Sequence, residues 1–231
     1  MHKVQRNEPP EGLNEKNIEF NKENHSKEEV KNTWNSFINT NLKKKTVEQL
    51  KKMFKGCCAY CEGSYEGTSY PQIEHFKPKS LYPELMFDYN NMNLACQICN
   101  MTKLDKYNEK LINPTEDEPD EHLKYKAYMI CALDERGKTT IDMLNLNSEE
   151  RTGKREEDYN KINDRLQLIN KWIERMDEEN EKITQSFIEL IDQTVKDVKS
   201  KFEEDYEYST MYRHNFKEII EELDKFLKKV S

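Results

Sequence analysis

The C-terminal part of the chain repeats apolar residues three and four positions apart, which is the spacing of amphipathic helices. Three such stripes predict three helices, and core packing between antiparallel helices accounts for all of them. The stripes are Ile162, Leu166, Ile169, Ile173 and Met176; Ile183, Phe187, Leu190, Ile191, Thr194 and Val198; and Phe216, Ile219, Ile220, Leu223, Phe226, Leu227 and Val230.

Two more helices are predicted before residue 57. The first covers residues 27–40, with Ser26 as N-cap and Glu29 at the capping-box position. In the second, Thr46 and Gln49 have capping-box spacing, and Gly56 is expected to end the helix. Residues 1–25 are polar and show no period, so they read as a flexible N-terminal arm.

The pattern changes between residues 57 and 106, where glycines, prolines, tyrosines and paired cysteines replace the helical period. This residue composition is typical of a small unit of short strands and loops that a metal ion holds together. Residues 107–147 are mixed, with short strands expected over 125–133 and 138–144. The expected fold class is α+β, with N-terminal helices over 26–56, a core over 57–106, and a mixed then helical region over 107–231.

Composition narrows the class of protein. Of 231 residues, 35% are hydrophobic and 35% are charged, which fits a soluble, helix-rich protein of one module plus attachments. No apolar run approaches the ~20 residues that span a membrane, and the N-terminus lacks the apolar region of a secretion signal. We therefore expect no membrane association and a cytoplasmic location.

The net charge of -8 is distributed unevenly. Residues 1–110 carry 17 Lys+Arg and 15 Asp+Glu, a balance of +2, which leaves 20 and 30, a balance of -10, for residues 111–231. The near-neutral first half permits nucleic-acid binding. The acidic helical half is better suited to a protein partner.

Two CxxC pairs dominate the candidate chemistry: Cys58 with Cys61, and Cys96 with Cys99, separated by 34 residues. Four thiolates in this arrangement can close one structural Zn²⁺ site. A redox CxxC or two disulfides are the alternatives, and a reducing compartment disfavours the disulfides. Cys57 and Cys131 are interpreted as small buried residues, although Cys57 could replace Cys58 as a ligand.

Glu74 and His75 lie between the two pairs, at the end of a predicted strand. Neutral histidine is the usual general base near pH 7, and a carboxylate suits Mg²⁺. Asn100 follows the second pair, where its amide oxygen could be a second metal ligand, and Asn91 could cross-link the connecting loop through backbone hydrogen bonds. Lys77, Lys79 and Lys103 are candidate phosphate contacts, with ordinary surface lysines as an equal alternative.

The order of these residues resembles the ββα-metal HNH endonuclease family. The pattern is Cys58-x-x-Cys61, Glu74-His75, then Asn91-Met92-x-x-Ala95-Cys96-x-x-Cys99-Asn100-x-x-Lys103. The resemblance implies a zinc-braced ββα-metal unit embedded among helices, with His75 as base and Asn91 orienting the loop. It also implies that Glu74 and Asn100 hold a catalytic Mg²⁺ or Mn²⁺. At the position of Glu74 the family more often has aspartate, and at the position of Asn100 it more often has histidine.

A closer resemblance covers about residues 45–160 and is to the HNH subunits of Septu-type anti-phage defence systems. It is carried by CAYCE at 58–62, IEHFKPKS at 73–80, LACQICN at 94–100 and TIDMLNLN at 140–147. It implies an endonuclease acting on nucleic acid, DNA more than RNA, together with an ABC-type ATPase. The alternatives are a zinc-ribbon module that binds nucleic acid without cutting it, and an adaptor whose acidic helices bind a protein.

Overall fold

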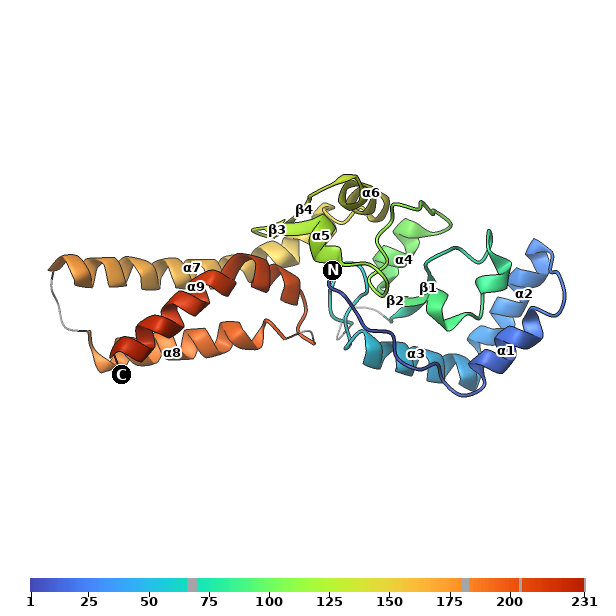
Figure 1. Cartoon of the computed structure of the whole chain (residues 1–231), viewed down its shortest axis with the longest axis horizontal. Coiled ribbons are helices and arrows are strands. Elements are labelled where there is room, and N and C mark those ends of the chain that lie inside the picture. Colours follow the sequence, from blue (N-terminus) through green and yellow to red (C-terminus); the bar gives the residue numbers. More distant parts are fainter. Residues whose placement is uncertain (66–69, 180–182, 204, 231) are drawn as a thin grey trace. The chain divides into compact units, whose positions relative to one another are not determined.

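The computed structural model describes residues 1–65, 70–179, 183–203 and 205–230, and it divides the chain into two compact units (Figure 1). The first unit comprises residues 1–123 and 132–146, and the second comprises 124–131 and 147–231. The described residues are mostly helical and include two two-stranded sheets, so the predicted α+β class is confirmed.

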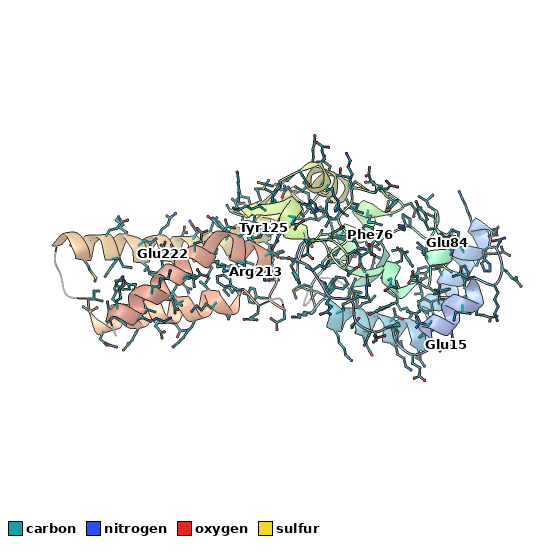
Figure 2. All side chains as sticks on the ribbon, in the orientation of Figure 1. Glu15, Phe76, Glu84, Tyr125, Arg213 and Glu222 are labelled. Atoms are coloured by element: carbon teal, nitrogen blue, oxygen red, sulfur yellow. The ribbon has the colours of Figure 1, made fainter. Side chains whose placement is uncertain are left out.

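A β-hairpin followed by a helix forms the middle of the first unit (Figure 1). Strand β1 (Gln72–His75) pairs antiparallel with β2 (Met92–Ala95), so that Gln72 lies opposite Ala95 and His75 lies opposite Met92. Helix α4 (Gln97–Lys103) starts directly after β2 and contacts both strands. The loop between the strands starts at Phe76, labelled in Figure 2, and contains η1 (Pro83–Leu85) and η2 (Tyr89–Asn91).

Helices α1 (Leu13–Phe20), α2 (Lys27–Ile38) and α3 (Asn41–Met53) complete the core around the hairpin. The capping box predicted for α2 is confirmed, because Ser26 Oγ accepts from Glu29 N and the Glu29 carboxylate accepts from Ser26 N at 2.7 Å. Large side chains that are almost fully buried fill the core: Leu13, Phe37, Leu50, Tyr60, Phe87, Met92 and Leu94.

Residues 1–25 are not a flexible arm. Met1, Val4 and Leu13 are buried, and Val4 N donates to Pro114 O at 2.7 Å. These anchors are too sparse to create a period in the sequence, and their partners lie far along the chain. The cap predicted at Thr46 is also wrong: Thr40 caps α3, whereas Thr46 lies inside the helix and donates to Leu42 O at 2.8 Å.

Residues 107–146 differ from the expectation in two ways. The strand predicted over 138–144 is part of helix α6 (Glu135–Leu144), whose N-cap Asp134 accepts from Gly137 N. Helix α6 packs against α4 and α5 (Pro119–His122), so residues 107–123 and 132–146 belong to the first unit and not to a separate C-terminal region. Strands β3 (Leu123–Lys126) and β4 (Met129–Ala132) form the second sheet.

The second unit contains the long helices α7 (Glu149–Glu179), α8 (Gln185–Ser200) and α9 (Ser209–Val230). The three predicted helices are confirmed. Tyr159 stacks on Phe216 with ring centroids 5.3 Å apart, and Trp172 stacks on Phe187 at 5.6 Å, so the apolar stripes pack against one another. None of the described helices is long and apolar enough to cross a membrane.

Candidate active site and metal centre

The four predicted cysteine ligands converge. The Sγ atoms of Cys58, Cys61, Cys96 and Cys99 all lie within 4.8 Å of one another, and those of Cys61 and Cys96 are 3.8 Å apart. A tetrahedron with Zn–S bonds of ~2.3 Å has S–S edges of about 3.8 Å, so the cluster fits zinc.

The remaining cysteines lie outside this cluster, and no two of the six, all of them described, form a disulfide. Cys57 is buried as predicted, whereas Cys131 is only partly buried. Backbone contacts connect the cluster to the hairpin: Ala59 N donates to Leu94 O at 2.9 Å, and Cys96 Sγ caps α4 by accepting from Cys99 N at 3.4 Å. The four-cysteine cluster is therefore attached to β2 and to the start of α4.

His75 is the last residue of β1, and its ring is buried between the loop and α2. The ring edge meets Trp34 at 4.7 Å between centroids, and Nε2 lies 2.9 Å from Met86 O. Because a carbonyl only accepts hydrogen bonds, Nε2 carries the proton, and Nδ1 of the neutral ring has the free lone pair. Burial, followed by the charge of Lys79, lowers the pKa of His75 to about 3.

Asn91 closes the loop that carries Met86. Its Oδ1 accepts from Lys77 N at 2.8 Å, and its Nδ2 donates to Lys77 O at 2.9 Å and to Leu85 O at 3.2 Å. The side chain thus holds the start of the loop against the residue that precedes Met86. Through Met86 O, these bonds also restrict the orientation of the His75 ring.

Glu74 points to the opposite face of β1 from His75, because neighbouring strand residues alternate. It is 2% exposed, Oε1 lies 2.5 Å from Lys103 Nζ, and Oε2 accepts from the hydroxyl of Tyr60. Lys103 Nζ also donates to His75 O at 2.7 Å. Lys103 is fully buried, so it cannot serve as the expected phosphate contact. Nothing in the sequence singled out Tyr60 apart from its place inside the first CxxC pair.

Asn100 lies on the side of α4 that faces β1, where its Nδ2 donates to Gln72 Oε1 at 2.5 Å. Gln72 and Glu74 share one face of the strand. The carboxylate of Glu74 and the amide oxygen of Asn100 are donor types that suit a hard divalent ion. A carboxylate has about four lone-pair sites, so Glu74 retains acceptor capacity beside its two present contacts. An ion there would compete with the ammonium of Lys103.

Lys77 and Lys79 are partly exposed and lie beside aromatic rings. Lys77 Nζ is 5.7 Å from the ring centre of Tyr82 and 5.9 Å from that of Tyr107, and Lys79 Nζ is 5.2 Å from that of Trp34. Burial lowers the pKa of Lys79. Both ammonium groups stay accessible enough for a phosphate, which is not true of Lys103.

No motif in the sequence indicated that Arg6 contributes to the site. Its guanidinium donates to Tyr89 O at 3.0 Å, to Asn90 O at 2.9 Å and to Met92 O at 2.5 Å, which are the main-chain carbonyls on either side of Asn91. It also donates to Thr115 Oγ1 at 2.6 Å. These partners lie more than 80 residues away along the chain, so no local pattern could have found them.

The sequence is similar to a family of known proteins and to two curated relatives. Residues 58–106 match the family model described as HNH endonuclease. A Septu protein PtuB from Bacillus thuringiensis is 40% identical over 105 residues, covering 44% of this chain and 41% of the relative. A second Septu protein PtuB, from Bacillus mycoides (strain KBAB4), is 35% identical over 141 residues, covering 46% of this chain and 48% of the relative.

The matched segment spans less than half the length of either curated relative. Within that segment, the family match coincides with the hairpin from β1 to β2, helix α4 and the four-cysteine cluster. Residues 58–106 are therefore similar in sequence to the HNH endonuclease family, and the hairpin, the helix and the cysteine cluster all lie within this matched segment.

Proposed function

We propose that this chain is a metal-dependent endonuclease that hydrolyses phosphodiester bonds, with DNA favoured over RNA. The observation that carries the proposal is the state of His75. Its Nε2 is tied to Met86 O, which leaves Nδ1 of a neutral imidazole as a proton acceptor at the end of β1. The HNH match over residues 58–106 supports the same chemistry.

In this proposal His75 takes a proton from the attacking water, and Asn91 keeps the loop that orients His75 in place. Glu74 and Asn100 would hold a divalent ion, Mg²⁺ or Mn²⁺. Such an ion stabilises negative charge on the phosphate and on the leaving oxygen. Because Glu74 and His75 are the last two residues of β1, they would approach one phosphate from different sides of the strand end. Lys77 and Lys79 would contact neighbouring phosphates.

The test is cleavage of supercoiled plasmid, single-stranded DNA and RNA, with and without Mg²⁺ or Mn²⁺, by the wild type and by His75→Ala. General-base catalysis contributes ~10²–10⁴-fold, so we expect His75→Ala to lose at least ~10²-fold in rate. Zinc content should stay near that of the wild type, whereas loss of the buried ring and of its bond to Met86 O should lower the melting temperature. The assay is therefore run at a temperature at which both proteins are folded. Cleavage by the variant at the wild-type rate would refute the proposal.

A zinc module that binds nucleic acid without cutting it is the second candidate. The observation that favours it is that both Glu74 oxygens already have partners in the structure. The same plasmid assay decides between the two. Binding without metal-dependent cleavage by the wild type, under every condition tested, would select the non-catalytic module.

We further propose that the protein acts in the cytoplasm in anti-phage defence, with an ABC-type ATPase as partner. Support comes from the curated relatives named Septu protein PtuB and from the net charge of -10 over residues 111–231. Exposed acidic residues of this C-terminal half would provide the contact with the partner. The test is co-purification of the ATPase with the full chain and with a variant whose exposed acidic residues on α7–α9 are neutralised.

A further inference from the structure

Helix α3 presents a row of exposed lysines. Among its 13 residues are five lysines and one glutamate. Lys44, Lys45, Lys51 and Lys52 are all exposed, and none of them forms an ion pair with a residue in the part of the chain that the structure describes. In contrast, lysines of the second unit pair with acids one turn away, as Lys161 does with Glu157 and Lys196 with Asp192.

Folding accounts for Lys51 and Lys52, which lie in the last turn of α3 and favour the helix dipole, but it does not account for the lysines at the start of the helix. The N-terminal end of a helix carries partial positive charge, so cations there are destabilising. Nevertheless Lys43, Lys44 and Lys45 occupy the third to fifth positions of α3, and its first turn contains no acidic residue. The helix is held instead by the Thr40 cap and by its buried residues Thr46, Leu50 and Met53. The charge on the opposite face therefore points to an external ligand.

The geometry of the face suits a polyanion. Lys44 and Lys51, like Lys45 and Lys52, are seven residues apart, which is about two helical turns or ~10.5 Å along the axis. Two lysine pairs therefore lie on one side of a rigid helix. Helix α3 contacts β2, so the lysine face is fixed relative to the hairpin that carries Glu74 and His75 (Figure 1).

Nucleic acid fits this face better than an acidic protein does. Stable protein interfaces have an apolar centre, whereas α3 contributes none of the exposed large hydrophobic residues. Phosphate backbones are bound mainly by lysine and arginine, without apolar contact. We propose that the α3 face formed by Lys44, Lys45, Lys51 and Lys52 binds the sugar-phosphate backbone of a nucleic acid. The choice of ligand rests on the proposed function.

The test compares the quadruple variant Lys44→Gln, Lys45→Gln, Lys51→Gln and Lys52→Gln with a control of equal charge. The control replaces four other exposed lysines of the first unit by glutamine: Lys27, Lys31, Lys106 and Lys110. Both sets are placed in a His75→Ala background, so that binding of labelled duplex and single-stranded DNA is measured by fluorescence anisotropy without cleavage. Titrations cover about 50 to 200 mM salt, the range over which phosphate contacts are lost.

Each lost phosphate contact lowers the slope of log K against log salt by about 0.9 for duplex and about 0.7 for single strands. For the α3 variant, we expect the slope to fall by the amount that corresponds to at least about two phosphate contacts. For the control, we expect a fall that corresponds to less than about one contact. Equal slopes for the variant and the control would overturn the proposal, as would loss of binding to an acidic partner protein with DNA binding unchanged. Lys44 and Lys45 lie at the start of α3 and Lys51 and Lys52 in its last turn, so the dipole effects of the four substitutions oppose one another. The melting temperatures of the variant and of the control are therefore measured, and binding is compared only below both.

This result is separable from that of the nuclease test. If the wild type binds DNA but never cuts it, the endonuclease proposal fails, while the slope comparison still decides whether α3 is the binding face. If cleavage is observed and the slopes are equal, the nuclease stands and the α3 face does not.

Discussion

Replacing Lys103 by methionine would remove an ammonium group from a buried site while keeping most of the side-chain volume. Lys103 is fully buried, and its Nζ contacts Glu74 Oε1 at 2.5 Å and His75 O at 2.7 Å. The variant leaves the Glu74 carboxylate buried with only the Tyr60 hydroxyl as partner. Removing one member of a buried ion pair costs about 3–5 kcal/mol, so we expect a loss of about that size in the free energy of unfolding.

The assay is a double-mutant cycle followed by urea unfolding with zinc held constant. Glu74→Gln alone leaves the Lys103 charge without its counter-ion, whereas the double variant leaves a neutral pair. We expect the double variant to be more stable than the sum of the two single losses predicts, by on the order of 2 kcal/mol or more. Lys106→Met, at an exposed lysine three residues further along the chain, is the control and should change stability by less than ~0.5 kcal/mol.

If Lys103→Met lowered the free energy of unfolding by less than about 1 kcal/mol, Lys103 and Glu74 would not be a stabilising buried ion pair, because such a value is typical of exposed ion pairs. Coupling near zero in the cycle would lead to the same conclusion. The result also bears on the metal proposal. If the Glu74 carboxylate is strongly stabilised by Lys103, it can bind a metal ion in one of two ways. Either the ammonium group moves away, or the ammonium group and the ion contact the carboxylate together.

Three further predictions concern glycine packing, the cysteine cluster and a partly buried carboxylate. Gly137→Ala should destabilise the protein by about 2 kcal/mol or more in urea unfolding, because a Cβ there would overlap His122 O and lie 3.2 Å from Ala132 Cα. Gly153→Ala in α7, with nothing within 4 Å, should instead stabilise by about 0.5–1 kcal/mol, and the same sign for both would contradict this reasoning. Cys96→Ser should lose zinc and lower the melting temperature, while Cys131→Ser should retain zinc by metal analysis. Burial opposes ionisation of Asp117, but the hydrogen bonds from Arg136 and Asn113 N prevail and lower its pKa below 3.8. The stabilisation is therefore present above pH 3.8 and lost as pH falls through the folded pKa, so the destabilisation by Asp117→Asn should shrink below that pH.

Features set by neighbours in the sequence could be predicted. The two CxxC pairs, the Ser26 capping box and the three apolar stripes each depend on spacings of three or four residues, and the structure contains all of them. The cap at Thr46 failed because a capping-box spacing also occurs within a helix, and Thr40 was the competing start. The strand expected over 138–144 failed because Asp134 caps a helix at that point.

Features set by distant contacts could not be predicted. Lys103 looked like a surface lysine, and only the fold buries it beside Glu74. Arg6 lies in a segment without a hydrophobic period. Its hydrogen-bond partners include main-chain carbonyls more than 80 residues away along the chain. The same limit applies to His75: its sequence position marks it as a base, whereas the contact with Met86 O that selects its tautomer exists only in three dimensions.

The two proposed catalytic side chains are held by different parts of the molecule. Tyr60 lies inside the first CxxC pair and Lys103 one turn after the second, so the four-cysteine cluster positions both groups that hold Glu74. His75 depends instead on Met86 O, on the bonds of Asn91 across the loop and on the contacts of Arg6 with the carbonyls beside Asn91. Zinc loss should therefore disturb Glu74 first, whereas changes at Asn91 or Arg6 should disturb His75 while the zinc remains bound. Because Glu74 and His75 face opposite sides of β1, damage to one side chain need not displace the other.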